Sequence, residues 1–129
     1  MIKFKDEKDM TLFFSLHPAL ILIFSDLNNY AYENHGMNLV ITDTISTLEE
    51  DKKIGRVSAS HREKRALDIR ANNLPQEVVR DLCNYINNKW AYREYHYLAH
   101  SGATRLAYPH GKGDNYHIHL AIHARYALK

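Results

Sequence analysis

Histidine occupies three of the four odd positions in one short segment near the end of this 129-residue chain, at 117, 119 and 123. The even positions of the same segment, 116 to 122, are aromatic or aliphatic. In a strand, alternate residues share a face, so we expect the apolar side chains in the core and the imidazoles on the opposite face. His117 and His119, about 7 Å apart along such a strand, could both line one metal site.

A second cluster lies upstream, where His61 is followed seven residues later by Asp68. Residues 65–70 alternate in character, which predicts a strand with Leu67 and Ile69 in the core and Asp68 on the other face. His61, Asp68 and His119 together offer two neutral imidazoles and one carboxylate. That ligand set leaves Zn²⁺ a fourth position for water and is typical of a catalytic zinc site rather than a structural one.

These two motifs resemble those of the zinc peptidases of the D-alanyl-D-alanine carboxypeptidase and L-alanyl-D-glutamate endopeptidase type, whose fold is shared by the hedgehog signalling domain. The likeness rests on the run from Ser58 to His61, on Arg65-Ala66-Leu67-Asp68-Ile69 and on His117-Ile118-His119. It covers the chain from about His17 onward. The resemblance implies that His61, Asp68 and His119 bind Zn²⁺ and that the substrate is a peptide stem of bacterial peptidoglycan.

Other positions of the chain differ from the family pattern. Family members usually have glycine in the turn that follows the first histidine, where this chain has Lys64. The family often places a glutamate shortly before the last histidine as general base, and Asp114 and His117 are the two candidates for that role here. An arginine that holds the substrate carboxylate in many members has only Arg56 as a counterpart, so we expect Arg56 to bind substrate.

The composition predicts one soluble domain spanning residues 1–129. Seventeen basic and fifteen acidic residues give a net charge of +2, which is far from the basic excess of a dedicated nucleic-acid binder. The single cysteine, Cys83, excludes an internal disulfide, and we expect it to be an inert core residue. The longest apolar stretch, residues 12–24, is too short for a membrane span, and acidic residues precede it where a signal peptide would be basic.

These features predict synthesis in the cytoplasm without a signal peptide. Together with the small size and the family resemblance, they are typical of a phage or prophage lysis enzyme, an endolysin, that acts at the bacterial cell wall. The sequence does not indicate an oligomeric state.

The hydrophobic pattern predicts an α+β fold in which helices pack on a small sheet. The family resemblance implies that this sheet is antiparallel, as in the hedgehog and DD-peptidase fold. We expect residues 46–55 to form an exposed loop and residues 1–10 to form a loose N-terminal segment. The expected helices span residues 18–34 and 75–88, and the expected strands span residues 39–42, 65–70, 104–108 and 116–123.

Two other functions also account for part of the sequence. Enzymes that nick single-stranded DNA carry a similar His-hydrophobic-His strand, and Tyr85 could then be the nucleophile. That alternative gives no role to His61 or Asp68, and a charge of +2 is poor for binding a phosphate backbone. The third possibility is a zinc-binding module of the same fold that has lost catalysis.

Overall fold

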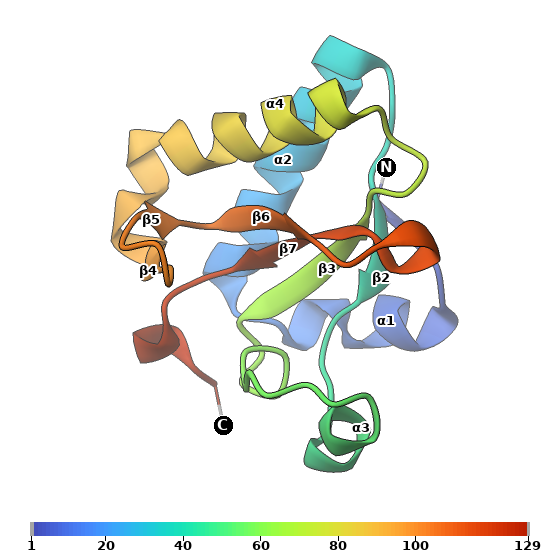
Figure 1. Cartoon of the computed structure of the whole chain (residues 1–129), viewed down its shortest axis with the longest axis vertical. Coiled ribbons are helices and arrows are strands. Elements are labelled where there is room, and N and C mark those ends of the chain that lie inside the picture. The colour runs from blue at the N-terminus through green and yellow to red at the C-terminus, as the bar shows by residue number, and fades with distance from the viewer. Residues whose placement is uncertain (1, 129) are drawn as a thin grey trace.

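A mixed β-sheet forms the centre of the molecule in the computed structural model, which describes residues 2–128 (Figure 1). Within these residues the sheet has five strands in the order β1-β2-β3-β7-β6, and a separate two-stranded sheet pairs β4 with β5. The strands of the large sheet are β1 (Lys3–Phe4), β2 (Val40–Asp43), β3 (Ala66–Arg70), β6 (Ala107–His110) and β7 (His117–Ala121). The small sheet consists of β4 (Tyr97–Leu98) and β5 (Thr104–Arg105).

Two long helices connect and cover the strands. The α-helices are α1 (Glu7–Leu12), α2 (Pro18–His35), α3 (Leu48–Lys53) and α4 (Gln76–Asn88). Short 3₁₀ helices are η1 (Phe13–Ser15), η2 (Trp90–Tyr95), η3 (Gly113–Asn115) and η4 (Ala124–Tyr126). The helix α2 begins at Pro18, because proline lacks an N–H and the first N–H of a helix has no partner within the helix. It ends at His35, and Gly36 caps it with a φ of 64° in the left-handed region.

The hydrophobic core lies between one face of the large sheet and the helices α2 and α4. In Figure 1, α2 passes behind the strands and α4 runs along one side of them. Leu67 and Ile69 from β3 and Ile118 and Leu120 from β7 are fully buried in this core. Because side chains alternate along a strand, the residues between them point to the opposite face of the sheet, away from α2 and α4.

The α+β class predicted from the sequence is confirmed, but the sheet is not purely antiparallel. β1 pairs with β2 in parallel, whereas the other pairs of the large sheet are antiparallel. A parallel pair needs a long crossover connection, and here α2 lies in that connection. The predicted helices and the first two predicted strands agree with the structure to within one or two residues at each end. The expected strand over 104–108 is divided into β5 and β6, and the last strand ends at Ala121 instead of at residue 123.

The N-terminal segment is part of the fold, so the expectation of a loose segment over residues 1–10 is wrong for the described residues 2–10. The strand β1 pairs with the edge of the sheet, and α1 follows it. Asp9 on α1 is buried, and its carboxylate accepts a hydrogen bond of 2.6 Å from the hydroxyl of Thr44. Burial raises the pKa of Asp9. These long-range contacts hold the segment, and no local pattern in the sequence shows them.

Residues 46–55 also differ from the prediction, because α3 replaces most of the expected loop. Thr47 and Glu50 form a reciprocal capping box: the Thr47 hydroxyl accepts from the Glu50 N–H, and the Glu50 carboxylate accepts from the Thr47 N–H. This pattern is a sequence signal for a helix start, whereas the expected loop rested on the run of charged residues alone. The buried carboxylate of Asp51 on α3 accepts a hydrogen bond from Arg56.

Cys83 lies buried on α4, as expected for a core residue, and burial raises the pKa of its thiol to about 12. The thiol therefore stays protonated at neutral pH and is a poor nucleophile. In the part of the chain that the structure describes, none of the helices combines the length and the apolar composition that a bilayer span requires.

Candidate metal centre

The neighbouring strands β3 and β7 bring two of the predicted ligands together. In their antiparallel register Asp68 lies directly opposite His119, and Arg70 lies opposite His117. Since Leu67, Ile69, Ile118 and Leu120 occupy the core face, these four polar residues share the face away from α2 and α4. The strand pairing therefore converts a separation of 51 residues between Asp68 and His119 into a side-chain contact.

The third predicted ligand, His61, lies in a tight turn just before β3. The N–H of Lys64 donates to the carbonyl of His61 at 3.1 Å, and this turn folds the imidazole back over the start of the strand. His61 is only 1% exposed. Its Nδ1 donates to the main-chain carbonyl of Thr44 at 2.6 Å, which fixes the tautomer of the neutral ring, with the lone pair on Nε2.

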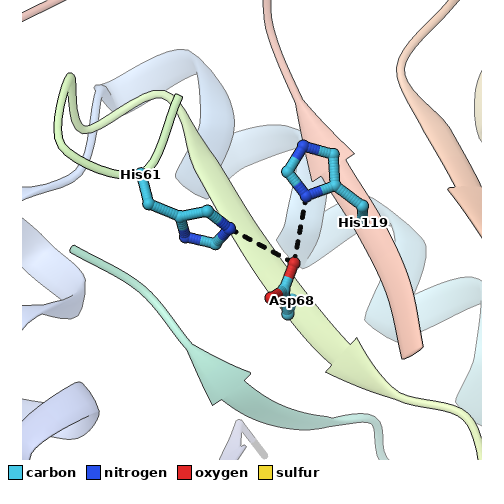
Figure 2. Close-up of side chains that lie close together, drawn as sticks. All are labelled: His61, Asp68 and His119. Atoms are coloured by element: carbon cyan, nitrogen blue, oxygen red, sulfur yellow. Dashed lines mark hydrogen bonds and ion pairs between the residues drawn. The ribbon is translucent and has the colours of Figure 1, made fainter. Parts of the chain in front are cut away.

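The side chains of His61, Asp68 and His119 converge on one point (Figure 2). Oδ1 of Asp68 lies 3.3 Å from Nε2 of His61 and 3.1 Å from Nδ1 of His119. One ligand atom from each of the three residues lies within 4.8 Å of the other two. The three residues predicted from the sequence thus form a buried group that could hold a metal ion.

The donor set and two of its three ligand–ligand distances fit a zinc ion, and the two histidine donors lie within 4.8 Å of each other. In a tetrahedral site with bonds of about 2.0–2.1 Å, ligand atoms lie about 3.3–3.4 Å apart. The observed distances of 3.3 and 3.1 Å from the Asp68 oxygen are close to that value. The hydrogen bond from His61 to Thr44 also supplies the outer contact that orients metal-binding imidazoles in proteins.

Electrostatics keep Asp68 ionised despite its burial. Burial by itself disfavours the carboxylate, but the hydrogen bonds and charge of His119 and His61 outweigh it and hold the pKa of Asp68 well below its usual range. Burial lowers the pKa of His119, so its imidazole is neutral near pH 7. For His61, burial also opposes the charged form, but the contact with Asp68 is stronger and raises its pKa. The buried group therefore contains one ionised carboxylate, which favours a bound cation.

His117 lies beside the group without belonging to it. Its Nε2 is 3.7 Å from Oδ1 of Asp68, and its Nδ1 donates to the carbonyl of Asn115 at 2.7 Å. The lone pair on Nε2 therefore faces the metal centre. Asp114, the other predicted general base, is exposed on η3 and lines the neighbouring cleft together with Asp68 and His117.

Arg56, the predicted substrate-binding residue, also lies at the site. Its guanidinium donates to Asp43 at 2.8 Å and to Asp51 at 3.1 Å, and one of its nitrogens is 3.9 Å from Oδ2 of Asp68. Burial opposes its charge, but the neighbouring carboxylates outweigh this and raise its pKa further. The connection between α3 and β3 therefore places a permanent positive charge next to the metal centre.

An open cleft of about 550 Å³ gives access to the centre. His61, Asp68, His117 and His119 line it on one side, and Ile54 and Val57 from the segment after α3 line it on another. Val57 is 95% and Ile54 66% exposed, so this wall presents apolar side chains to solvent. The cleft is large enough for a peptide segment.

Sequence reasoning missed two residues that shape this site. The carbonyl of Thr44 orients His61, and any residue at that position could supply it, so no side-chain signal exists. The ring of Tyr108 on β6 lies 5.3 Å from the His119 ring, centre to centre, and lines the cleft. Its place follows from the pairing of β6 with β7, which puts Tyr108 opposite His119.

Tyr85 does not lie at this site. It is on α4, where its hydroxyl donates to Asp26 at 2.6 Å and its ring stacks on Tyr30 with centres 3.8 Å apart. Asp26 and Tyr30 belong to α2, which packs on the core face of the sheet. The sheet therefore separates Tyr85 from His117 and His119, and the structure does not bring together the residues that a DNA-nicking enzyme of the predicted kind needs.

The turn after His61 contains a strained residue. Lys64 has φ = 59°, and it is the one non-glycine residue with positive φ between residues 2 and 128. This is the position where the resembling peptidases usually have glycine. A side chain in this left-handed region destabilises the folded state by about 1–2 kcal/mol, and glycine avoids this strain. Glycine also gives the unfolded chain more conformational entropy, which offsets part of the gain.

We therefore expect Lys64→Gly to raise the free energy of unfolding by about 0.5–1 kcal/mol. Urea denaturation followed by circular dichroism measures this change. Lys64→Ala is the matched control: it also removes the lysine side chain but keeps the strain, so it should give no comparable gain. If alanine and glycine stabilise equally, the backbone conformation of Lys64 is not the cause.

The geometry of this chain alone defines the candidate metal centre. Comparison with protein-family models, with curated proteins and with solved structures finds no match.

Proposed function

We propose that this protein is a zinc-dependent peptidase of the hedgehog and DD-peptidase type that cleaves peptide stems of bacterial peptidoglycan. The observation that carries the proposal is the buried group of His61, Asp68 and His119 at the base of an open cleft. Two imidazoles and one carboxylate are the protein ligands of many catalytic zinc sites, whereas structural sites use four protein ligands, mostly cysteines. The resemblance of the two sequence motifs supplies the substrate class.

The three ligands have separate tasks in this proposal. Nε2 of His61 and Nδ1 of His119 would bind Zn²⁺ as neutral donors, and Asp68 would add the negative charge. When bound, Zn²⁺ would supply Lewis-acid chemistry that polarises a peptide carbonyl and makes hydroxide available near neutral pH. The hydrogen bond from His61 to the Thr44 carbonyl would hold the imidazole in place for this task.

His117 would transfer protons in this proposal. With Nδ1 donating to the Asn115 carbonyl, Nε2 is free to accept a proton from the attacking water and to return it to the leaving amine. A single group can perform both transfers because the attacking oxygen and the leaving nitrogen are bonded to the same carbon, so both come within reach of one base. Asp114 could serve the same function from η3, but no ion pair or hydrogen bond with residues 2–128 orients its carboxylate.

Arg56 would bind the peptide next to the cleaved bond. Asp43 and Asp51 hold its guanidinium in place, so it need not lose much side-chain entropy when a substrate oxygen binds. The exposed Ile54 and Val57 would cover apolar parts of the bound peptide. A small peptidase of this kind fits the role of a phage or prophage lysis enzyme that acts at the cell wall.

Purified peptidoglycan provides the test. The zinc-loaded protein should release stem fragments that mass spectrometry detects, and the same protein treated with a chelator should release none. The fragment masses identify the bond and separate an endopeptidase from a carboxypeptidase. Intact stems in the presence of stoichiometrically bound zinc would remove the enzyme proposal and favour a zinc-binding module without catalysis.

A further inference from the structure

A second cleft of about 600 Å³ adjoins the metal centre on the side of β1 and β2. It shares Arg56, Asp68 and His117 with the cleft over the metal centre, so the two form one continuous groove. A peptide bound across the metal centre would therefore extend into this second cleft.

Two cations line this second cleft without a partner. The side chains of Lys5 and Arg70 form neither an ion pair nor a hydrogen bond with any other residue between 2 and 128. Arg70 is half-buried on β3 and points to the same face as Asp68, and Lys5 follows the edge strand β1. The amides of Asn72 and Asn73 line the same cleft and likewise have no partner in the described part of the chain.

The carboxylates of the cleft do not neutralise these cations. Asp43 pairs with Arg56, and Asp68 contacts His61 and His119. Asp114 also lines the cleft but forms no ion pair with Lys5 or Arg70. A half-buried guanidinium without an anion is unusual, since its donor geometry suits a carboxylate held by two parallel hydrogen bonds.

We propose that Lys5 and Arg70 form a carboxylate-binding subsite, which takes a carboxylate of the bound peptide on this side of the metal centre. The choice of a peptide as the ligand rests on the proposed function. The carboxylate belongs either to the C-terminus of the peptide or to an acidic side chain. Both sources present the same planar group with two oxygens to Arg70.

Binding to the metal-free protein tests the subsite without relying on activity. The probe is a stem pentapeptide with a fluorescent label at its N-terminus, prepared in three forms: with all carboxylates free, with the C-terminus amidated, and with the side-chain carboxylates amidated. Fluorescence anisotropy measures the dissociation constants. We expect the free form to bind about tenfold more tightly than one of the two amidated forms. The amidated form that binds weakly lacks the recognised carboxylate and so identifies its source.

Substitutions then assign this preference to the two cations. The preference is the dissociation constant of the amidated peptide divided by that of the free peptide. Arg70→Gln and Lys5→Gln should each reduce this ratio to near one, mainly by weakening binding of the free peptide. Arg70→Lys should retain part of it because the charge stays. Arg80→Gln is the matched control, since Arg80 is exposed on α4 across the sheet. Circular dichroism confirms that each variant is folded.

The outcomes separate this subsite from the proposed function. Equal binding of all three peptides by the wild-type protein overturns the subsite. An Arg70→Gln variant whose affinity falls by the same factor for all three peptides also overturns it. If zinc-loaded protein leaves the pentapeptide uncut, although its binding shows the carboxylate preference and depends on Arg70, the peptidase proposal fails and the subsite stands. If it cleaves all three peptides with equal efficiency, the subsite fails and the peptidase proposal stands.

Discussion

Asp68→Ala is expected to reduce the release of stem peptides by the zinc-loaded protein by about 10³-fold or more, because metal chemistry supplies several kcal/mol and each 1.4 kcal/mol is a factor of ten. Asp68 is the common contact of His61 and His119, and it carries the only negative charge in the group. Its removal takes away one ligand and the contact that aligns the other two. The initial rate of fragment release at saturating zinc measures the effect.

The chain offers a matched control for this substitution. Asp81 on α4 forms a similar pair with His35, with 2.7 Å between the carboxylate and Nε2. That pair lies on the α2 and α4 side of the molecule, outside the metal centre. Asp81→Ala should therefore leave fragment release within about twofold of wild type, as expected for a remote surface pair. Full activity in Asp68→Ala would show that catalysis does not use the metal centre.

His117→Gln is expected to reduce the rate of fragment release by about 10²–10⁴-fold, the usual contribution of a general acid–base. Unlike the substitution of Asp68, it should leave the zinc content unchanged, because Nε2 of His117 lies 3.7 Å from the Asp68 oxygen and outside the group of three ligands. Glutamine keeps a polar side chain of similar length but cannot accept and return a proton near neutral pH. Parallel measurements of rate and of bound zinc separate the two effects.

Asp114→Asn and His110→Gln complete this comparison. His110 lies opposite His117 on β6, with ring centres 5.4 Å apart, and it is exposed, so its substitution should have little effect. Asp114→Asn should also retain most of the activity if His117 is the base. A loss in Asp114→Asn that exceeds the loss in His117→Gln would assign the proton transfer to Asp114 instead.

The three residues of the candidate metal centre could be predicted from the sequence because short local patterns, together with the family resemblance, indicate them. The alternation of residues 116–122 places His117 and His119 on one strand face, and residues 65–70 do the same for Asp68. What the sequence could not provide is the register. Asp68 meets His119 only because β3 and β7 pair with these two residues opposite each other, which depends on packing across the whole core.

The elements that were not predicted depend on contacts between distant parts of the chain. β1 forms only because α2 returns the chain to the same edge of the sheet, where β2 can pair with it. That pairing places Lys5 in the groove, so the carboxylate subsite could not be inferred while residues 1–10 were expected to be loose. The capping box at Thr47 was readable from sequence, whereas the contact of Arg56 with Asp43 required the folded loop.

Metal analysis of the purified protein tests the central claim most directly. After dialysis against zinc and removal of the excess, the wild-type protein should contain about one Zn²⁺ per chain. His61→Ala, Asp68→Ala and His119→Ala should each contain far less, whereas His123→Ala, a histidine of the same C-terminal run that is outside the group, should equal wild type. If all three variants keep the zinc content of the wild-type protein, these residues do not form a metal site and the account is contradicted.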